Sequence, residues 1–352
     1  MSRNLREENS RRRNQIPFLI LSVVLLVVLG IVVGMAVNAD RKTDTQQTVN
    51  TDTKQPDTQN ANNPEKWQEG VIKHDGKYYK FNHDLSIYLF MGIDKEEEVT
   101  MTEDYADGGQ SDAMFLLITD SRNKKVKVVS INRNTMTDIV MYDENGDKLD
   151  TVNAQICTQH AFGDGGHTSC RRAVEAVSHL FYNLPINGYM SMHMGAIPTM
   201  NDGVGGVEVT VLSDITDTQR QVELKKGETV TLEGMEAYCY LRSRDIDSFD
   251  SASDRLRRQE QYITAYMEKL ETITAGSTSK ALQIYESMEP YIITNVSYAE
   301  LIAELIEYEF DDNGMYTIPG ETSMGEKFEE FYVDEDALYE LILQVCYEEL
   351  SS

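Results

Sequence analysis

The longest uninterrupted apolar stretch of the chain lies near its N-terminus and runs from Ile16 to Val37. It carries no charge, and at about 1.5 Å per helical residue it is long enough to cross a hydrocarbon core of about 30 Å. Five arginines and only two glutamates precede it, so the positive-inside rule predicts a cytoplasmic N-terminus and an extracellular remainder. A cleaved signal peptide is the alternative, but its apolar core would be shorter, about 7–15 residues. We therefore expect a cytoplasmic tail at 1–15 and a retained single-pass anchor in the cell membrane at 16–37.

The segment that follows the anchor is strongly polar. Residues 38–66 consist mainly of Thr, Asp, Gln and Asn. Such a segment buries too little apolar surface to offset the entropy lost on ordering, so we expect a disordered stalk. The remaining residues, about 280 in number, suffice for one large exported domain. We divide them into a main domain at 67–275 and a C-terminal extension at 276–352 that packs on it.

Beyond the stalk, apolar runs of strand length alternate with segments of helical periodicity. The predicted strands are Ser86–Ile93, Ala113–Thr119, Lys125–Ile131, Val207–Val211 and Met315–Ile318. The predicted helices are Cys170–Phe181, Arg255–Leu270, Tyr298–Tyr308 and Val333–Glu349. A turn-like segment at 120–124 joins two of the strands as a hairpin. Interleaved strands and helices predict a layered α/β domain with a mixed sheet.

The charge balance narrows the classes of partner. The chain has 59 acidic and 32 basic residues and a formal net charge of −27. No basic stripe offsets the repulsion of a phosphate backbone, which argues against nucleic acid. The same excess disfavours binding of the exported domain to an anionic membrane surface.

Four cysteines lie in the exported part, in a compartment that permits disulfides. None has metal-site spacing. Cys157 and Cys170 flank a glycine-rich loop, and a disulfide between them could stabilise the folded state by roughly 3 kcal/mol. We expect Cys239 and Cys346 to be small buried thiols, and the sequence leaves the pairing open.

Two carboxylates stand beside predicted strands, where α/β sheets generally bind ligands. Asp94 follows one strand and Asp112 precedes the next. If these strands are neighbours, both carboxylates reach one edge and suit Mg²⁺, which takes oxygen ligands. Turn capping by each aspartate is the alternative. Glu96 and its acidic neighbours read as a solvated loop.

Against the acidic excess, five arginines fall within seventeen residues: Arg242, Arg244, Arg255, Arg257 and Arg258. The guanidinium fork matches phosphate oxygens. If 238–244 is extended, Arg242 and Arg244 share a face; in a helix, Arg258 and Gln259 lie one turn beyond Arg255. Neutralisation by aspartates of the intervening loop, as exposed ion pairs, is the alternative. Another arginine, Arg133, follows a strongly β-forming run.

Five segments resemble, in order along the chain, the motifs of the LytR-CpsA-Psr family of exported bacterial cell-wall ligases. The matching segments are Met91–Asp94, Ser111–Asp112, Ser130–Arg133, Asp202–Val209, and Leu232–Ala237 continuing through Arg242–Arg244 to Arg255–Gln259. The resemblance implies a three-layer α-β-α fold around a mixed sheet, with an apolar tunnel for a polyprenyl chain. It also implies transfer of a glycopolymer, of the teichoic acid or capsular type, from undecaprenyl pyrophosphate to peptidoglycan.

The resemblance assigns roles to individual residues. Arg133, Arg242, Arg244, Arg255 and Arg258 would grip the pyrophosphate, with Gln259 assisting. Asp94 and Asp112 would organise Mg²⁺, and one of them would act as base toward the acceptor hydroxyl; together with Arg133 they form the catalytic set. Arg257 falls outside the motif, and we expect it on the surface.

The chain departs from the family pattern at a few positions. Gln110 stands where the family usually has Arg, and Asn132 and Asn134 flank Arg133 in place of Pro and Asp. These departures keep open an alternative, a regulator that binds polyprenyl phosphates without turnover. A polyprenyl pyrophosphate hydrolase is a further alternative.

Overall fold

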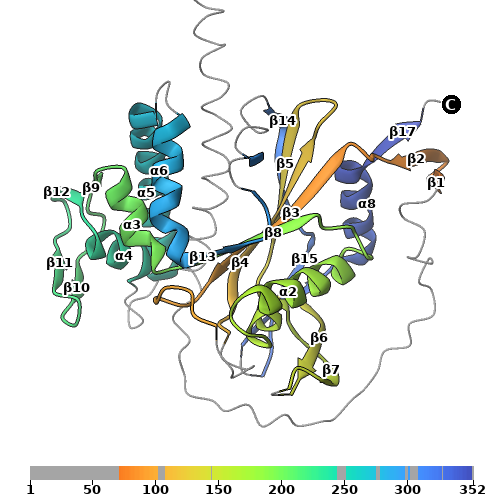
Figure 1. The fold of residues 1–352 in the computed structure, drawn as a ribbon, viewed down its shortest axis with the longest axis horizontal. Coiled ribbons are helices and arrows are strands. Elements are labelled where there is room, and N and C mark those ends of the chain that lie inside the picture. Colours follow the sequence, from red (N-terminus) through yellow and green to blue (C-terminus); the bar gives the residue numbers. More distant parts are fainter. Residues whose placement is uncertain are drawn as a thin grey trace, which may run out of the picture.

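A computed structural model shows a mixed sheet enclosed by helices (Figure 1). It describes residues 71–101, 108–143, 145–243, 251–274, 278–297, 300–301, 308–326 and 328–350. The described part of the chain has a six-stranded central sheet in the order β13-β8-β3-β4-β5-β14. Its strands are β3 (Leu85–Ile93), β4 (Ser111–Asp120), β5 (Lys125–Ile131), β8 (Gly188–His193), β13 (Ile292–Thr294) and β14 (Glu309–Thr317).

The sheet is mixed, as predicted. β3, β4 and β5 form an antiparallel meander, which confirms the predicted hairpin between β4 and β5. β8 runs parallel to β3, and β14 runs parallel to β5. Both edge strands, β13 and β14, come from the C-terminal part of the chain, so that part completes the central sheet.

Alternating side chains of the strands build two cores, one on each face of the sheet. Phe90, Leu117 and Val128 belong to one buried cluster, whereas their neighbours Leu89, Leu116 and Val129 belong to the other. The first core packs against α3 (Ala196–Gly203), α4 (Met235–Arg242), α5 (Ser251–Thr274) and α6 (Thr278–Met288). The second packs against α2 (His167–Leu180) and α8 (Glu335–Cys346). The three-layer α-β-α arrangement follows, with α3–α6 grouped on one side in Figure 1.

Small sheets and short helices surround this centre. The additional strands are β1 (Val71–His74), β2 (Lys77–Phe81), β6 (Met136–Tyr142), β7 (Lys148–Gln155), β9 (Val207–Thr210), β10 (Ile215–Asp217), β11 (Val222–Leu224), β12 (Thr229–Leu232), β15 (Gly320–Met324), β16 (Glu329–Val333) and β17 (Tyr347–Leu350). Two 3₁₀ helices, η2 (Ile156–Ala161) and η3 (Glu289–Tyr291), complete the described elements. Among these residues no helix is both long and apolar enough to span a bilayer; the predicted tail, anchor and stalk lie outside them.

The extended conformation that would have placed Arg242 and Arg244 on one face is not found. Residues Met235–Arg242 form α4, which brings Arg242 to a helix end. Ala237 through Leu241 are all buried, and a short continuous apolar run does not distinguish a strand from a buried helix by periodicity. Arg242 therefore belongs to a helix and not to a strand.

Candidate functional site

The antiparallel pairing of β3 and β4 brings the two predicted carboxylates to the same end of the sheet. Asp94 directly follows β3, and Asp112 is the second residue of β4. Ile93 pairs with Ser111 across the two strands. Because β3 and β4 are neighbours, Asp94 and Asp112 lie at the same end of the two strands, as expected for this pairing.

The loop that precedes β4 fixes Asp94. The Gln110 backbone N–H donates to Asp94 Oδ1 at 2.7 Å, and the Asp94 N–H donates to the Gln110 carbonyl at 3.1 Å. Gly109 has φ +79°, and a Cβ there would lie 2.7 Å from Ile93 Cγ2 and 3.1 Å from Asp94 Oδ1. Only glycine adopts this conformation easily and leaves this space.

His160 supports the same loop from behind. Its Nδ1 lies 3.0 Å from the Gly109 carbonyl. Burial lowers the pKa of His160 to about 4, so the imidazole is neutral at physiological pH and Nδ1–H donates to Gly109. This histidine therefore shapes the loop and does not serve as a proton carrier at neutral pH.

Asp112 and Arg133 form a buried pair in which one carboxylate oxygen remains available. Asp112 is 4% exposed, and its Oδ1 lies 3.1 Å from Arg133 Nη2. That contact is an ion pair without hydrogen-bond geometry, and Oδ1 accepts no hydrogen bond within the described part of the chain. Burial raises the pKa of Asp112 to about 7; the charge of Arg133 opposes the rise and that of Asp94 adds to it.

Gln110, one of the departures from the family pattern, orients Arg133. Its Oε1 accepts a 2.6 Å hydrogen bond from Arg133 Nη2. The same nitrogen donates to the Cys157 sulfur at 3.2 Å. Gln110, Asp112 and Cys157 thus direct the guanidinium of Arg133 toward the carboxylate pair. We call Asp94, Gln110, Asp112 and Arg133 the carboxylate site.

The carboxylate site fits the donor set that Mg²⁺ takes. Magnesium is bound through one or two carboxylates, with waters and substrate phosphates completing its shell. Asp94 and Asp112 supply two carboxylates, and within the described part of the chain Asp112 Oδ1 is a buried oxygen without a hydrogen-bond donor. An ion there would satisfy an atom whose burial otherwise costs free energy.

Arg242 lies at the end of α4 and reaches toward the loop after β3. Its Nη1 donates to Glu96 Oε1 and to the Tyr238 hydroxyl, each at 2.5 Å. Its guanidinium carbon lies 5.4 Å from the centre of the Tyr238 ring. Because Glu96 is two residues beyond Asp94, the loop after β3 links the carboxylate site to this arginine.

Arg220 is a further arginine at this place, and the sequence did not single it out. Its Nη2 pairs with Glu96 Oε2 at 2.7 Å, and its Nη1 pairs with Asp217 Oδ2 at 3.0 Å. Glu96, expected in a solvated loop, instead bridges two guanidinium groups. We call Glu96, Asp217, Arg220, Tyr238 and Arg242 the arginine network. Its members come from three separate segments of the chain and carry no shared motif, so only the fold reveals it.

Arg258 is held inside the protein. It is 4% exposed, its Nε donates to the Tyr240 carbonyl at 3.0 Å, and its Nη1 donates to Ser213 Oγ at 2.7 Å. Its Nη2 donates to the Ser243 carbonyl. Arg258 thereby ties α5 to the chain that leaves α4 at Arg242. The neighbouring Arg257 is exposed, as predicted.

The remaining predicted arginines are only partly placed. Arg244 lies outside the described residues. Arg255 and Gln259 belong to α5, but their side chains are also outside the described part of the structure. Their roles at the pyrophosphate stay predictions.

The cysteines do not pair. All four thiols are free and buried, so the disulfide considered between Cys157 and Cys170 is wrong. Two of the thiols have polar neighbours: Cys157 lies beside Arg133, and the Cys170 sulfur lies 3.3 Å from Ser191 Oγ. Cys239 and Cys346 are buried as expected.

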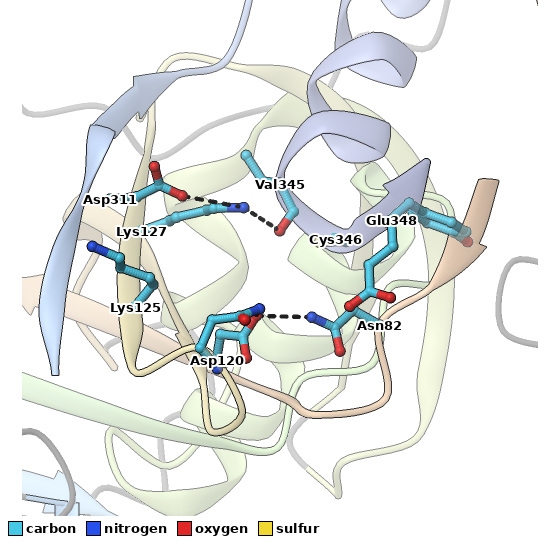
Figure 2. Close-up of a pocket in the computed structure, with 10 residues that line it drawn as sticks. Asn82, Asp120, Lys125, Lys127, Asp311, Val345, Cys346 and Glu348 are labelled. Atoms are coloured by element: carbon cyan, nitrogen blue, oxygen red, sulfur yellow. Dashed lines mark hydrogen bonds and ion pairs between the residues drawn. The ribbon is translucent and has the colours of Figure 1, made fainter. Parts of the chain in front are cut away.

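A separate polar pocket lies at the other end of β4, with a cavity volume of about 410 Å³ (Figure 2). Its wall includes Asp120, which is eight residues along the strand from Asp112, a separation of roughly 26 Å. Figure 2 shows two of its interactions: Asn82 donates to Asp120, and Lys127 contacts Asp311 and the Val345 carbonyl. This pocket is therefore not part of the carboxylate site.

Fold and site together define a class of protein: an α-β-α domain that presents one buried and one half-buried carboxylate beside arginines at one end of the strands of a mixed sheet. The model of the LytR_cpsA_psr family matches residues 37–343, and the chain belongs to this family.

Relatives and solved structures agree with this assignment. The chain is 30% identical over 223 residues to the polyisoprenyl-teichoic acid–peptidoglycan teichoic acid transferase TagV of Bacillus subtilis, covering 61% of this chain and 51% of TagV. It is 26% identical over 243 residues to the transferase TagU of Bacillus licheniformis, covering 66% of this chain and 70% of TagU. The chain thus spans only about half the length of that TagV.

Two solved structures share the fold. The crystal structure of B. subtilis TagV superposes with a TM-score of 0.50 at 26% identity, covering 74% of this chain and 96% of that one. Protein gbs0355 of Streptococcus agalactiae superposes with a TM-score of 0.53 at 19% identity, covering 74% of this chain and 86% of that one. The second likeness concerns the fold alone.

Proposed function

We propose that this protein is a membrane-anchored phosphotransferase that moves an anionic glycopolymer, of the teichoic acid or capsular type, from undecaprenyl pyrophosphate to peptidoglycan outside the membrane. The observation that carries the proposal is the loop after β3, which places Asp94 in the carboxylate site and Glu96 on Arg242. The relatives TagV and TagU, named as teichoic acid transferases, support the same reaction class.

The reaction is a phosphoryl transfer, which depends on positioning and charge neutralisation more than on a covalent nucleophile. A hydroxyl of peptidoglycan attacks the phosphorus that carries the glycopolymer. The new P–O bond forms as the bond to the polyprenyl phosphate breaks, and polyprenyl phosphate leaves. The hydroxyl proton passes to a carboxylate. Asp112 suits this role because burial raises its pKa to about 7.

The other residues of the site neutralise the pyrophosphate, fix the position of Arg242 or bind the metal. Arg133 and Arg242 neutralise the pyrophosphate, joined in our proposal by Arg244, Arg255 and Gln259. Arg258 contributes by fixing the end of α4 from which Arg242 extends. Asp94 and Asp112 would hold Mg²⁺, which when bound shields the phosphate charge. The polyprenyl chain would occupy an apolar tunnel in the helical layers.

The test is a transfer assay with the full chain, Mg²⁺, a polyprenyl-pyrophosphate-linked glycan and peptidoglycan oligomers. We expect a phosphodiester-linked conjugate, formed more slowly but still measurably by Arg242→Ala and at the wild-type rate by the exposed-arginine control Arg257→Ala. Free phosphate-ended polymer without conjugate would indicate a hydrolase. Lipid binding without turnover would indicate a regulator, and either result would reject the proposal.

A further inference from the structure

Charges alternate along the arginine network. Asp217 Oδ2 contacts Arg220 Nη1 at 3.0 Å, Arg220 Nη2 contacts Glu96 Oε2 at 2.7 Å, and Glu96 Oε1 contacts Arg242 Nη1 at 2.5 Å. The last guanidinium ends on the hydroxyl of Tyr238, one helical turn earlier in α4. Three parts of the chain meet here: the loop after β3, the turn after β10 and the end of α4.

Among the described residues, the arginine network holds the Arg242 guanidinium through Nη1 alone. Within the described part of the chain, Arg242 forms two hydrogen bonds, both through Nη1, and none through Nε or Nη2. The side chain is 22% exposed. A guanidinium anchored through Nη1 can still present its remaining N–H groups to phosphate oxygens as a fork.

Glu96 is itself held from two directions. Its carboxylate uses one oxygen for each arginine. Its backbone carbonyl oxygen would lie only 1.7 Å from a Cβ on residue 195, so the loop can pass this position only because Gly195 has no side chain.

We propose that Glu96 and Arg220 are positioning residues for Arg242: Arg220, anchored on Asp217, holds the Glu96 carboxylate, and Glu96 holds Arg242 oriented toward the donor pyrophosphate. This inference rests on the proposed function. It goes beyond that function because the loop that carries Asp94 also orients Arg242 through Glu96. One segment of the chain thereby aligns the metal-binding and pyrophosphate-binding parts of the site.

A double-mutant cycle distinguishes positioning from a merely structural ion pair. We expect Glu96→Gln and Arg220→Gln each to lower kcat/KM for transfer by about tenfold, equivalent to about 1.4 kcal/mol, mainly through a higher KM for the polyprenyl-pyrophosphate donor. In an Arg242→Ala background, either change should have little further effect. Glu223→Gln is the matched control, since it removes the ion pair between Glu223 and Lys225, whose atoms lie 2.7 Å apart on and beside β11, without touching Arg242.

The same variants are measured for binding of farnesyl pyrophosphate, with thermal unfolding to verify folding. Equal losses from Glu96→Gln in the wild-type and Arg242→Ala backgrounds would overturn the positioning role, as would unchanged kcat/KM. Absence of any conjugate from the wild-type chain would instead count against the proposed function, and the binding cycle then decides the positioning role alone. Additive or absent effects on binding would reject it.

Discussion

The carboxylate site and the arginine network adjoin each other but are built by different means. Strand register and backbone hydrogen bonds fix the first, in which Asp112 is 4% exposed. Ion pairs between long side chains fix the second, and the side chains of Arg242 and Glu96 are 22% and 36% exposed. The sheet therefore determines where the carboxylates lie, whereas the arginines depend on partners from several loops.

The difference predicts how each region responds to change. A backbone-built site keeps its geometry when one side chain is replaced by an isostere, so chemistry can be removed with little loss of structure. A network of side chains loses orientation when any one member is removed. Isosteric substitutions in the carboxylate site should therefore lower activity at nearly unchanged stability, whereas substitutions in the arginine network should lower activity by disturbing the orientation of the remaining side chains.

The largest effect is expected from Asp112→Asn. It keeps the shape of the side chain but removes a metal-binding and proton-accepting oxygen, so transfer should fall by about 10²–10³-fold. The free energy of unfolding at pH 8 should stay equal or rise, because a buried charge is removed. Transfer assays and urea unfolding measure the two effects. Asp138→Asn, at an exposed position of β6, is the control; a large loss of stability in Asp112→Asn would show that the carboxylate is structural.

Arg258→Ala should mainly destabilise the protein. It leaves the Tyr240 and Ser243 carbonyls and Ser213 Oγ without their donor, and unsatisfied buried acceptors cost about 1–3 kcal/mol each. We expect the free energy of unfolding to fall by about 3 kcal/mol, against about 0.5 kcal/mol or less for Arg257→Ala. Chemical denaturation measures both. Loss of transfer at unchanged stability would instead place Arg258 on the ligand.

The sequence predicted the parts of the site that depend on local pattern. The apolar runs before Asp94 and after Asp112 read correctly as strands, and the turn at 120–124 correctly joined the second of them to Lys125–Ile131, because these are local signals. The pairing of β3 with β4 was only a condition in the sequence analysis, and the structure shows it. Once those strands pair, the position of both carboxylates at one edge follows without knowledge of the rest of the fold.

The arginine network escaped prediction because its geometry depends on distant segments. Glu96 lies among other acidic residues and reads as solvated until α4 and the β10–β11 turn pack against it. Arg220 belongs to no cluster in the sequence. The helical state of α4 was also missed, since Ala237–Leu241 is buried on all sides and offers no amphipathic period.

Gly109→Ala tests the backbone-built region directly. The substitution places a methyl group against Ile93 and Asp94 at a position with φ +79°. We expect a loss of about 2 kcal/mol in unfolding free energy, from left-handed strain of about 1–2 kcal/mol plus the contact, and a clear fall in transfer. Gly227→Ala is the matched control, with φ +87° and nothing within 4 Å of the new methyl group. Equal stability and equal transfer in the two variants would show that the space at Gly109 is not required.

The smallest expected effect is the pH dependence of Mg²⁺ binding at the carboxylate site. Since the metal binds the ionised carboxylate and burial raises the pKa of Asp112 to about 7, affinity should fall by about tenfold per pH unit below pH 7 and level off above it. Without metal, the folded chain keeps a proton that the unfolded chain releases near pH 4, so stability contributed by this group is present at low pH and is lost as pH rises toward 7. Calorimetric titration at pH 6, 7 and 8, and urea unfolding with EDTA, measure the two trends. Asp112→Asn should flatten both, and an affinity for Mg²⁺ that is independent of pH between 6 and 7 would mean that the ion does not bind through Asp112.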